Sequence, residues 1–281
     1  MALEETQPRV VSIPLPRPVE VTGPARDGGR THVVLPAYNE AANLPALLDR
    51  FAALEFADGV TVWVVDDGSS DDTAAVALGA AGVDLQLVRH EVNRGLGQAV
   101  HSGLRAVLRV AHPDDIVVVM DADDTHDPAL IEPLWAEVAA GADVVICSRF
   151  VDGGDDATAP PVRRLLSRCA AALFRRIVAV EGVADFTSGF RAYRVSLLDR
   201  AARHWGERLV EEKGFACMVE LLLKLRHCEP VIREVPLLLR YDRKRGASKL
   251  RLRRTLAQYL RLLVRDRLAP PPHWALRGPG A

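Results

Sequence analysis

Two aspartates separated by one residue, Asp121 and Asp123, are the pair with the clearest chemical potential in this 281-residue sequence. They follow the apolar run Ile116 to Met120, which is typical of a buried β-strand. The chain turns where a strand ends, so both carboxylates could reach one Mg²⁺ or Mn²⁺ whose other positions are filled by water and a diphosphate. Such a metal would neutralise a departing nucleoside diphosphate. The alternative is that the two acids only close a turn, which is the more frequent role of an isolated motif of this kind.

Two further polar clusters also follow apolar runs. One runs from Asp66 to Ser69, and an aspartate there could accept hydrogen bonds from a nucleobase or a ribose hydroxyl. The other runs from Pro36 to Glu40. Each cluster alone could be an ordinary turn that caps the next helix. Because three clusters follow three predicted parallel strands, and such strand ends meet at one edge of a sheet, we expect all three to face one crevice.

The elements that would position these clusters alternate between strand and helix patterns. Apolar runs open the segments 32–36, 60–73, 85–90, 115–124 and 143–150. Their alternation with helical periodicity predicts an α/β fold with a mostly parallel sheet flanked by helices, in a single catalytic domain.

The second half of the chain completes this pattern. The Gly-, Asp- and Pro-rich segment 151–162 predicts a mobile loop over the crevice. Helical periodicity resumes around 163–180 and again at 207–228, and residues 231–241 predict a strand near the sheet edge. Gly95 and Gly97 lack the third glycine of a dinucleotide-binding motif, so they predict a glycine turn that feeds a helix.

Basic charge is concentrated at the C-terminal end. From Arg240 onward there are twelve lysines and arginines but only two aspartates. The helical pattern of 251–268 predicts an apolar face opposite a row of arginines, made of Leu252, Leu256, Tyr259, Leu260 and Leu263. This helix could lie on an anionic membrane surface, or it could pack on the domain with solvated arginines.

Composition excludes several classes of protein. A formal net charge of −1 argues against a nucleic-acid binder, and the sequence has no apolar run of the roughly 20 residues that span a bilayer. The four cysteines show no CxxC spacing, which suits reduced thiols and predicts a cytoplasmic location. We therefore expect a flexible leader at 1–30, a catalytic domain at 31–250, and a basic helix with a Pro-rich tail at 251–281.

Several motifs together resemble one enzyme group. LPAYNEAANLP, VVDDGSSDDT, NRGLGQA, MDADDTHDP, DFTSGFR and DRKRGASK resemble the dolichyl/polyprenyl-phosphate mannose synthase group of family 2 glycosyltransferases. They occur in that group's order over about residues 31–250. The resemblance implies a GT-A fold, a divalent metal, and inverting transfer of a hexose from a nucleotide sugar to polyprenyl phosphate. It also implies action at the cytoplasmic face of the membrane, where the basic tail described above could make a peripheral contact.

The resemblance also implies roles for individual residues. It places Pro36, Tyr38, Glu40 and Asp67 around the nucleotide, Asp121 and Asp123 at the metal and diphosphate, Arg149, Arg164 and Ser167 near the acceptor phosphate, and Arg191, Arg243 and Lys249 around the diphosphate or acceptor. We add Asp66, Gly95 and Ala122 to the residues expected to bind the donor. A lipid phosphate is already anionic, whereas a hydroxyl acceptor would need a general base. Asp185 and Glu220 are the candidates for that base, or else paired structural acids.

Three features keep a second function open. Thr125 stands where many relatives have glutamine, the acidic segment 152–156 is unusual beside an anionic lipid, and no membrane anchor is visible. We therefore expect mannose transfer from GDP-mannose, or a UDP-sugar, to polyprenyl phosphate, with a soluble enzyme acting on a small-molecule or secondary-metabolite hydroxyl as the alternative. A nucleotide-binding regulatory module without turnover is a third possibility, against which the two aspartates argue.

Overall fold

An eight-stranded sheet forms the centre of the computed structural model, which describes residues 9–11, 29–56, 59–178, 180–246 and 252–268. The strands are β1 (Arg9–Val11), β2 (Thr31–Ala37), β3 (Val60–Asp66), β4 (Asp84–Arg89), β5 (Ile116–Val119), β6 (Val144–Ser148), β7 (Arg191–Arg194) and β8 (Ile232–Pro236). Their order is β1-β4-β3-β2-β5-β7-β6-β8, and every neighbouring pair is parallel except those that involve β7. The predicted mostly parallel sheet is therefore confirmed.

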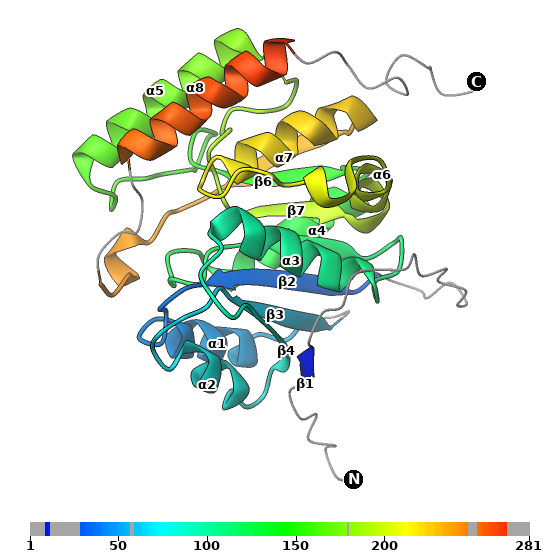
Figure 1. Ribbon diagram of the computed structural model, residues 1–281, viewed down its shortest axis with the longest axis vertical. Coiled ribbons are helices and arrows are strands. Elements are labelled where there is room, and N and C mark those ends of the chain that lie inside the picture. The colour runs from blue at the N-terminus through cyan, green and yellow to red at the C-terminus, as the bar shows by residue number, and fades with distance from the viewer. Residues whose placement is uncertain (1–8, 12–28, 57–58, 179, 247–251, 269–281) are drawn as a thin grey trace.

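Helices cover both faces of this sheet (Figure 1). They are α1 (Leu44–Ala53), α2 (Thr73–Leu78), α3 (Leu96–Leu108), α4 (Ile131–Ala139), α5 (Pro161–Ile177), α6 (Val195–Trp205), α7 (Cys217–Leu225) and α8 (Leu252–Leu268). Residues of α1, α2 and α4 share one apolar core with the sheet, and α3, α5, α6, α7 and α8 share the other. Successive side chains of a strand point to opposite faces, so Val33 packs into the first core and Val34 into the second.

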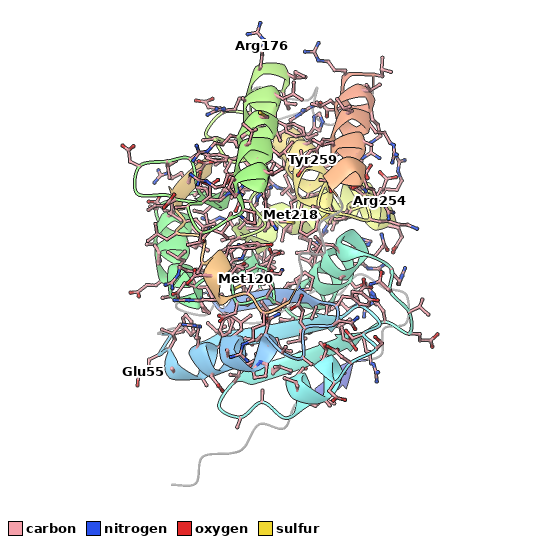
Figure 2. The ribbon with its side chains drawn as sticks, turned by 90° about the vertical axis from the view of Figure 1, so that its left-hand side faces the viewer. Glu55, Met120, Arg176, Met218, Arg254 and Tyr259 are labelled. Carbon is pink, nitrogen blue, oxygen red and sulfur yellow. The ribbon has the colours of Figure 1, made fainter. Side chains whose placement is uncertain are left out.

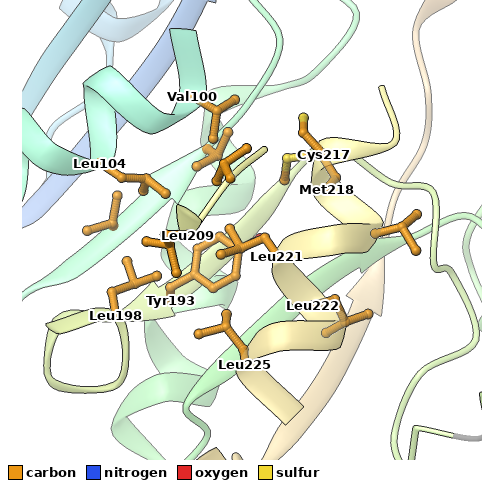
Figure 3. Packing of buried hydrophobic residues seen from close by; sticks show 14 of the residues in the cluster. Val100, Leu104, Tyr193, Leu198, Leu209, Cys217, Met218, Leu221, Leu222 and Leu225 are labelled. Carbon is orange, nitrogen blue, oxygen red and sulfur yellow. The ribbon is translucent and has the colours of Figure 1, made fainter. Parts of the chain in front are cut away.

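The second core joins the sheet to α3, α6 and α7. Figure 3 shows Val100 and Leu104 of α3 facing Tyr193 of β7, with Leu221 and Leu225 of α7 closing the cluster. These side chains are buried, and fully burying a large apolar side chain stabilises the fold by about 1.5–3 kcal/mol. The same core extends to α5 and α8, so the five helices α3, α5, α6, α7 and α8 are packed with the sheet in one continuous core.

The sequence pattern missed two strands. β7 is only four residues long and runs antiparallel between β5 and β6, and its sequence Arg-Ala-Tyr-Arg has no apolar run. β1 lies within the predicted leader and pairs with β4, whereas residues 1–8 and 12–28 lie outside the described residues. The predicted strand at 231–241 is confirmed as β8 at the sheet edge, although it ends at Pro236.

The segment 151–162 is more closely tied to the sheet than a simple loop. The backbone N–H of Asp155 donates to the carbonyl of Leu237 at 2.8 Å, and Asp155 forms a β-bridge with Leu238. Asp156 is buried and pairs with Arg164 and Arg168 of α5. The acidic charge of this segment is therefore partly neutralised by the helix that follows it.

Helix α8 lies beside α5 in both views of the molecule (Figures 1 and 2). The ring of Tyr259 meets that of Phe174 of α5 edge-on, with centroids 5.2 Å apart. Tyr259 and Leu263 are buried, but Leu256 and Leu260, predicted on the same face, are exposed. The prediction of a single apolar face was wrong, because α8 carries a second row of apolar side chains that points away from the core. The packed arrangement of this helix is confirmed, and the domain boundary at residue 250 stays a prediction.

Candidate active site

A cavity of about 930 Å³ opens at the carboxyl ends of β2, β3 and β5. Strands β3 and β5 are the two neighbours of β2 and lie on opposite sides of it, so the cavity lies where the strand order reverses. Its lining includes the predicted donor residues Pro36, Tyr38, Glu40, Asp67, Gly95, Asp121, Ala122 and Asp123. The structure thus brings the three polar clusters together, as expected from the sheet, while their roles as ligands stay predictions.

The two aspartates after β5 differ in their surroundings. Burial raises the pKa of the Asp121 carboxyl, and the negative charge of Asp123 raises it further. Burial acts on Asp123 in the same direction, but Lys244 outweighs it and holds the pKa of Asp123 below its ordinary value. Lys244 donates to Oδ2 of Asp123, and the hydroxyl of Thr125 donates to Oδ1 at 2.6 Å. Thr125 therefore orients an aspartate of the pair.

This pair fits a hexacoordinate cation that brings its own ligands. Among the described residues no cluster of three or more His, Cys, Asp or Glu side chains could hold a metal alone. Mg²⁺ and Mn²⁺ sites for phosphate chemistry need only one or two carboxylates, because water and phosphate complete the coordination. The raised pKa of Asp121 supports the fit, because a cation beside this carboxyl would offset the cost of its burial.

Asp67 is held in place from three sides. The backbone N–H groups of Arg94 and Gly95 donate to its two oxygens at 2.9 and 2.8 Å. His90 Nδ1 lies 2.7 Å from Oδ1, and its other nitrogen lies 2.8 Å from the hydroxyl of Ser102. A carboxylate only accepts, so we assign the Nδ1 hydrogen to His90. Gly95, at φ +95°, is the N-cap residue directly before α3, which confirms the predicted glycine turn.

Arg149, which the resemblance places near the acceptor phosphate, lines a small adjoining cavity of about 50 Å³. Arg149 donates from Nε and Nη2 to the two oxygens of Asp185, at 2.8 Å each, and from Nη1 to Ser167 at 3.2 Å. Burial alone would raise the pKa of Asp185, but Arg149 outweighs it and lowers that pKa. Asp185 therefore remains ionised and fixes the guanidinium, with Arg149 lining this second cavity.

Six predicted site residues lie outside both cavities or outside the described residues. Arg191 is 0% exposed and donates to the carbonyls of Met218 and Phe186, so it supports the core and does not face the cavity. The others are Arg164, paired with Asp156; Ser167, which accepts from Arg149; Arg243, paired with Asp127; Asp66, which accepts from Ser69 N–H and pairs with Arg89; and Lys249, outside the described residues.

The two candidate general bases are engaged in structural contacts. Asp185 is occupied by Arg149, as described above. Glu220 accepts from the backbone N–H groups of Glu211 and Glu212 and from Lys224, and it also pairs with Arg265 of α8. Neither carboxylate lines either of the two cavities described here, so the interpretation of both as paired structural acids is the one the structure supports.

Sequence reasoning missed several cations that line the large cavity. Arg163, not Arg164, lines both cavities, and its guanidinium lies over the Tyr241 ring at 5.1 Å. Ser167 lies four residues after Arg163, so helical spacing from Ser167 could have identified it. Figure 2 labels Arg254 at the end of α8 nearer the sheet, and this residue lines the cavity together with Lys213 and Lys244.

Comparison with known proteins identifies the family. The Glycosyl transferase family 2 model matches residues 32–201. The chain is 36% identical over 224 residues to the polyprenol monophosphomannose synthase of Mycolicibacterium smegmatis, covering 79% of this chain and 81% of that protein. It is 34% identical over 224 residues to the undecaprenyl-phosphate mannosyltransferase of Micrococcus luteus, covering 79% and 87%.

The fold is similar to that of a solved enzyme as well. Glucosyl-3-phosphoglycerate synthase from Mycobacterium tuberculosis, in complex with Mn²⁺, UDP and glucosyl-3-phosphoglycerate, superposes with a TM-score of 0.60 at 23% identity, covering 88% of this chain and 82% of that one. This likeness confirms the expected GT-A fold. The family match and the relatives together show that the chain belongs to glycosyl transferase family 2, and it is a glycosyltransferase.

Proposed function

We propose that this enzyme transfers mannose from GDP-mannose to a polyprenyl phosphate with inversion, using Mg²⁺ or Mn²⁺. One observation carries the choice of acceptor. Asp185 and Glu220, the two acids that could act as general base for a hydroxyl acceptor, are both held in ion pairs. Two arginines, Arg149 and Arg163, line the small cavity together with Asp121 and Asp123. An anionic phosphate needs no base and matches the planar fork of arginine.

The large cavity supplies the groups that the donor needs. Asp121 and Asp123 would hold the metal, and Asp67 would accept from the nucleobase or ribose. When bound, the cation would neutralise the diphosphate as the bond to the anomeric carbon breaks. Arg163 lies at both cavities and would orient the acceptor phosphate toward that carbon. Stabilisation of charge that develops only in the transition state is what accelerates such a transfer.

The relatives and neighbours support this assignment. The two named relatives are a polyprenol monophosphomannose synthase and an undecaprenyl-phosphate mannosyltransferase, which supports mannose and a polyprenyl phosphate. Glucosyl-3-phosphoglycerate synthase has been crystallised with Mn²⁺ and with Mg²⁺, in each case with UDP, which supports a divalent cation.

An acceptor comparison tests the proposal. The purified chain, given GDP-mannose and Mg²⁺ or Mn²⁺, should glycosylate a polyprenyl phosphate in detergent and leave the matching polyprenol unmodified, because only the phosphate carries the anionic nucleophile. Product formation is followed by mass spectrometry, with UDP-glucose as the alternative donor. Transfer to polyprenol or to a small hydroxyl acceptor at the same rate would support the alternative function and contradict ours.

We also propose that the enzyme works on the surface of an anionic membrane. None of the helices within the described ranges is long and apolar enough to cross a bilayer. Helices α5 and α8 instead form the outermost layer at one end of the molecule (Figure 1). Each of the two helices carries exposed apolar side chains, here together called the α5–α8 face: Val162, Leu165 and Leu173 on α5, and Leu256, Leu260, Val264 and Leu268 on α8.

Charge and position both favour a lipid partner for the α5–α8 face. Both helices also expose arginines, namely Arg168, Arg175, Arg176, Arg254, Arg261 and Arg267. Exposed apolar side chains together with arginines match the boundary between acyl chains and anionic headgroups. The same two helices contribute Arg163, Arg254 and Gln258 to the cavity lining, so a lipid phosphate would reach the cavity from this surface.

Charging the α5–α8 face should release the protein from vesicles. Leu260 and Val264 are each 58% exposed, so the double variant L260E/V264E should fold normally and lose most of its binding to phosphatidylglycerol vesicles in a sedimentation assay. V110E is the matched control, because Val110 is 61% exposed at the end of α3. Equal binding by both variants and the unmodified chain would contradict membrane contact through this face.

A further inference from the structure

Lys244 is positioned where it competes with a metal ion. Its ammonium donates to Oδ2 of Asp123, and the two side chains are only 9% and 12% exposed. The other oxygen of Asp123, Oδ1, accepts from both the hydroxyl and the backbone N–H of Thr125. Both oxygens of this aspartate are therefore engaged by the protein. A divalent cation that binds Asp123 has to share or replace one of these contacts.

The contact with Lys244 is the one that a cation would replace. Thr125 is two residues from Asp123 and donates to it within one turn, so its hydrogen bonds are compatible with a cation on the opposite oxygen. An ammonium and a divalent cation on the same oxygen would instead repel each other at close range. Asp121, the second carboxylate at this strand end, carries no positive charge and so cannot replace Lys244 as the counter-ion of Asp123.

The backbone beside Lys244 is fixed, so the exchange needs only a side-chain movement. The side chain of Asn43 accepts from the N–H of Arg245 at 2.8 Å and donates to its carbonyl at 3.1 Å. Before it, the N–H of Arg240 donates to the carbonyl of Thr125 at 3.0 Å. Lysine acts as a point charge on a flexible stem, and Lys244 lines the large cavity where the diphosphate would lie.

We propose that Lys244 is a resident counter-ion of Asp123 that exchanges with the metal when the donor arrives, moving its ammonium from the carboxylate to the diphosphate. The inference rests on the proposed metal-dependent function. It assigns Lys244 two successive partners and makes metal binding tighter when the donor is bound. Metal alone competes with the ammonium, whereas metal and diphosphate together give every charge a partner. Binding of the two should therefore be strongly cooperative.

Titration with Mn²⁺, monitored by the loss of the free-ion electron paramagnetic resonance signal, tests this without turnover. In the absence of nucleotide, K244M should bind Mn²⁺ about tenfold more tightly than the unmodified chain, as expected when one part-buried ion pair no longer competes. K244R should bind like the unmodified chain. R243M is the matched charge control, because Arg243 pairs with Asp127 and does not line the cavity. Adding GDP should tighten Mn²⁺ binding about tenfold or more in the unmodified chain, and far less in K244M.

Each other outcome has a definite meaning. Equal Mn²⁺ affinity for K244M and the unmodified chain overturns the exchange, and so does an equal gain in K244M and R243M, which would show only a general effect of charge. D123N separates this inference from the proposed function. If D123N loses Mn²⁺ binding while K244M is unchanged, the metal site stands and the exchange fails. If D123N binds Mn²⁺ normally, the metal assignment itself is wrong. Circular dichroism melting curves confirm that each variant is folded.

Discussion

Replacing Asp123 with asparagine should lower sugar transfer by about a thousandfold while the protein remains folded. The amide cannot supply the negative charge that a divalent cation needs, so the diphosphate would leave without its main neutralising partner. Losing a single transition-state electrostatic contact typically costs a factor of 10²–10³, and a metal contributes at least as much. Steady-state transfer with saturating donor, polyprenyl phosphate and Mg²⁺ or Mn²⁺ measures the effect.

The adjacent residue provides a matched control for this prediction. Asp124 pairs with Arg50 and does not line the cavity, and its φ of +60° is one that asparagine adopts readily. D124N therefore makes the same chemical change one residue away, and its transfer rate should stay within the same order of magnitude as that of the unmodified enzyme. Near-normal transfer by D123N, or equal losses in both variants, would rule out the metal assignment.

Replacing Arg163 with methionine should raise the KM for polyprenyl phosphate by about thirtyfold and leave the KM for the donor within about twofold. A charge-assisted contact to a phosphate contributes about 1.5–3 kcal/mol, and each 1.4 kcal/mol corresponds to a factor of ten. Arg163 lines both cavities, so its loss should affect the acceptor phosphate most directly. Initial rates measured over a matrix of donor and acceptor concentrations separate the two constants.

R164M is the comparison that makes this result specific. Arg164 is the next residue of α5, carries the same charge, and pairs with Asp156 outside both cavities. Its replacement should leave both KM values nearly unchanged. A thirtyfold effect in R164M with none in R163M would restore the original sequence assignment. An effect of R163M on the donor alone would place Arg163 at the diphosphate.

The sequence was sufficient to predict the scaffold and the convergence of the acidic clusters. Buried parallel strands have nearly continuous apolar sequences, and β2, β3 and β5 each have such a sequence. Once those strands are parallel neighbours, the residues after them have to meet at one edge. Asp67, Asp121 and Asp123 could therefore be placed together without any knowledge of their side-chain contacts.

The cations around the cavity could not be predicted to the same level. Consecutive residues of an α-helix point about 100° apart, so the choice between Arg163 and Arg164 depends on how α5 is rotated against the sheet. The resemblance of the motif DFTSGFR implied that Arg191 binds a phosphate, yet Arg191 donates inside the core to the carbonyl of Phe186, five residues away, and to that of Met218, 27 residues away. Such choices are set by tertiary contacts, which neither spacing nor composition records.

The position of α8 in the cavity wall has a consequence for synthesis of the chain. The cavity is lined by residues from Pro36 to Gln258, so its first and last walls are made more than two hundred residues apart. A nascent polypeptide that has not yet emerged as far as α8 lacks the part of the wall that Arg254, Thr255 and Gln258 contribute. The cavity is therefore complete only after the C-terminal part of the chain has been synthesised.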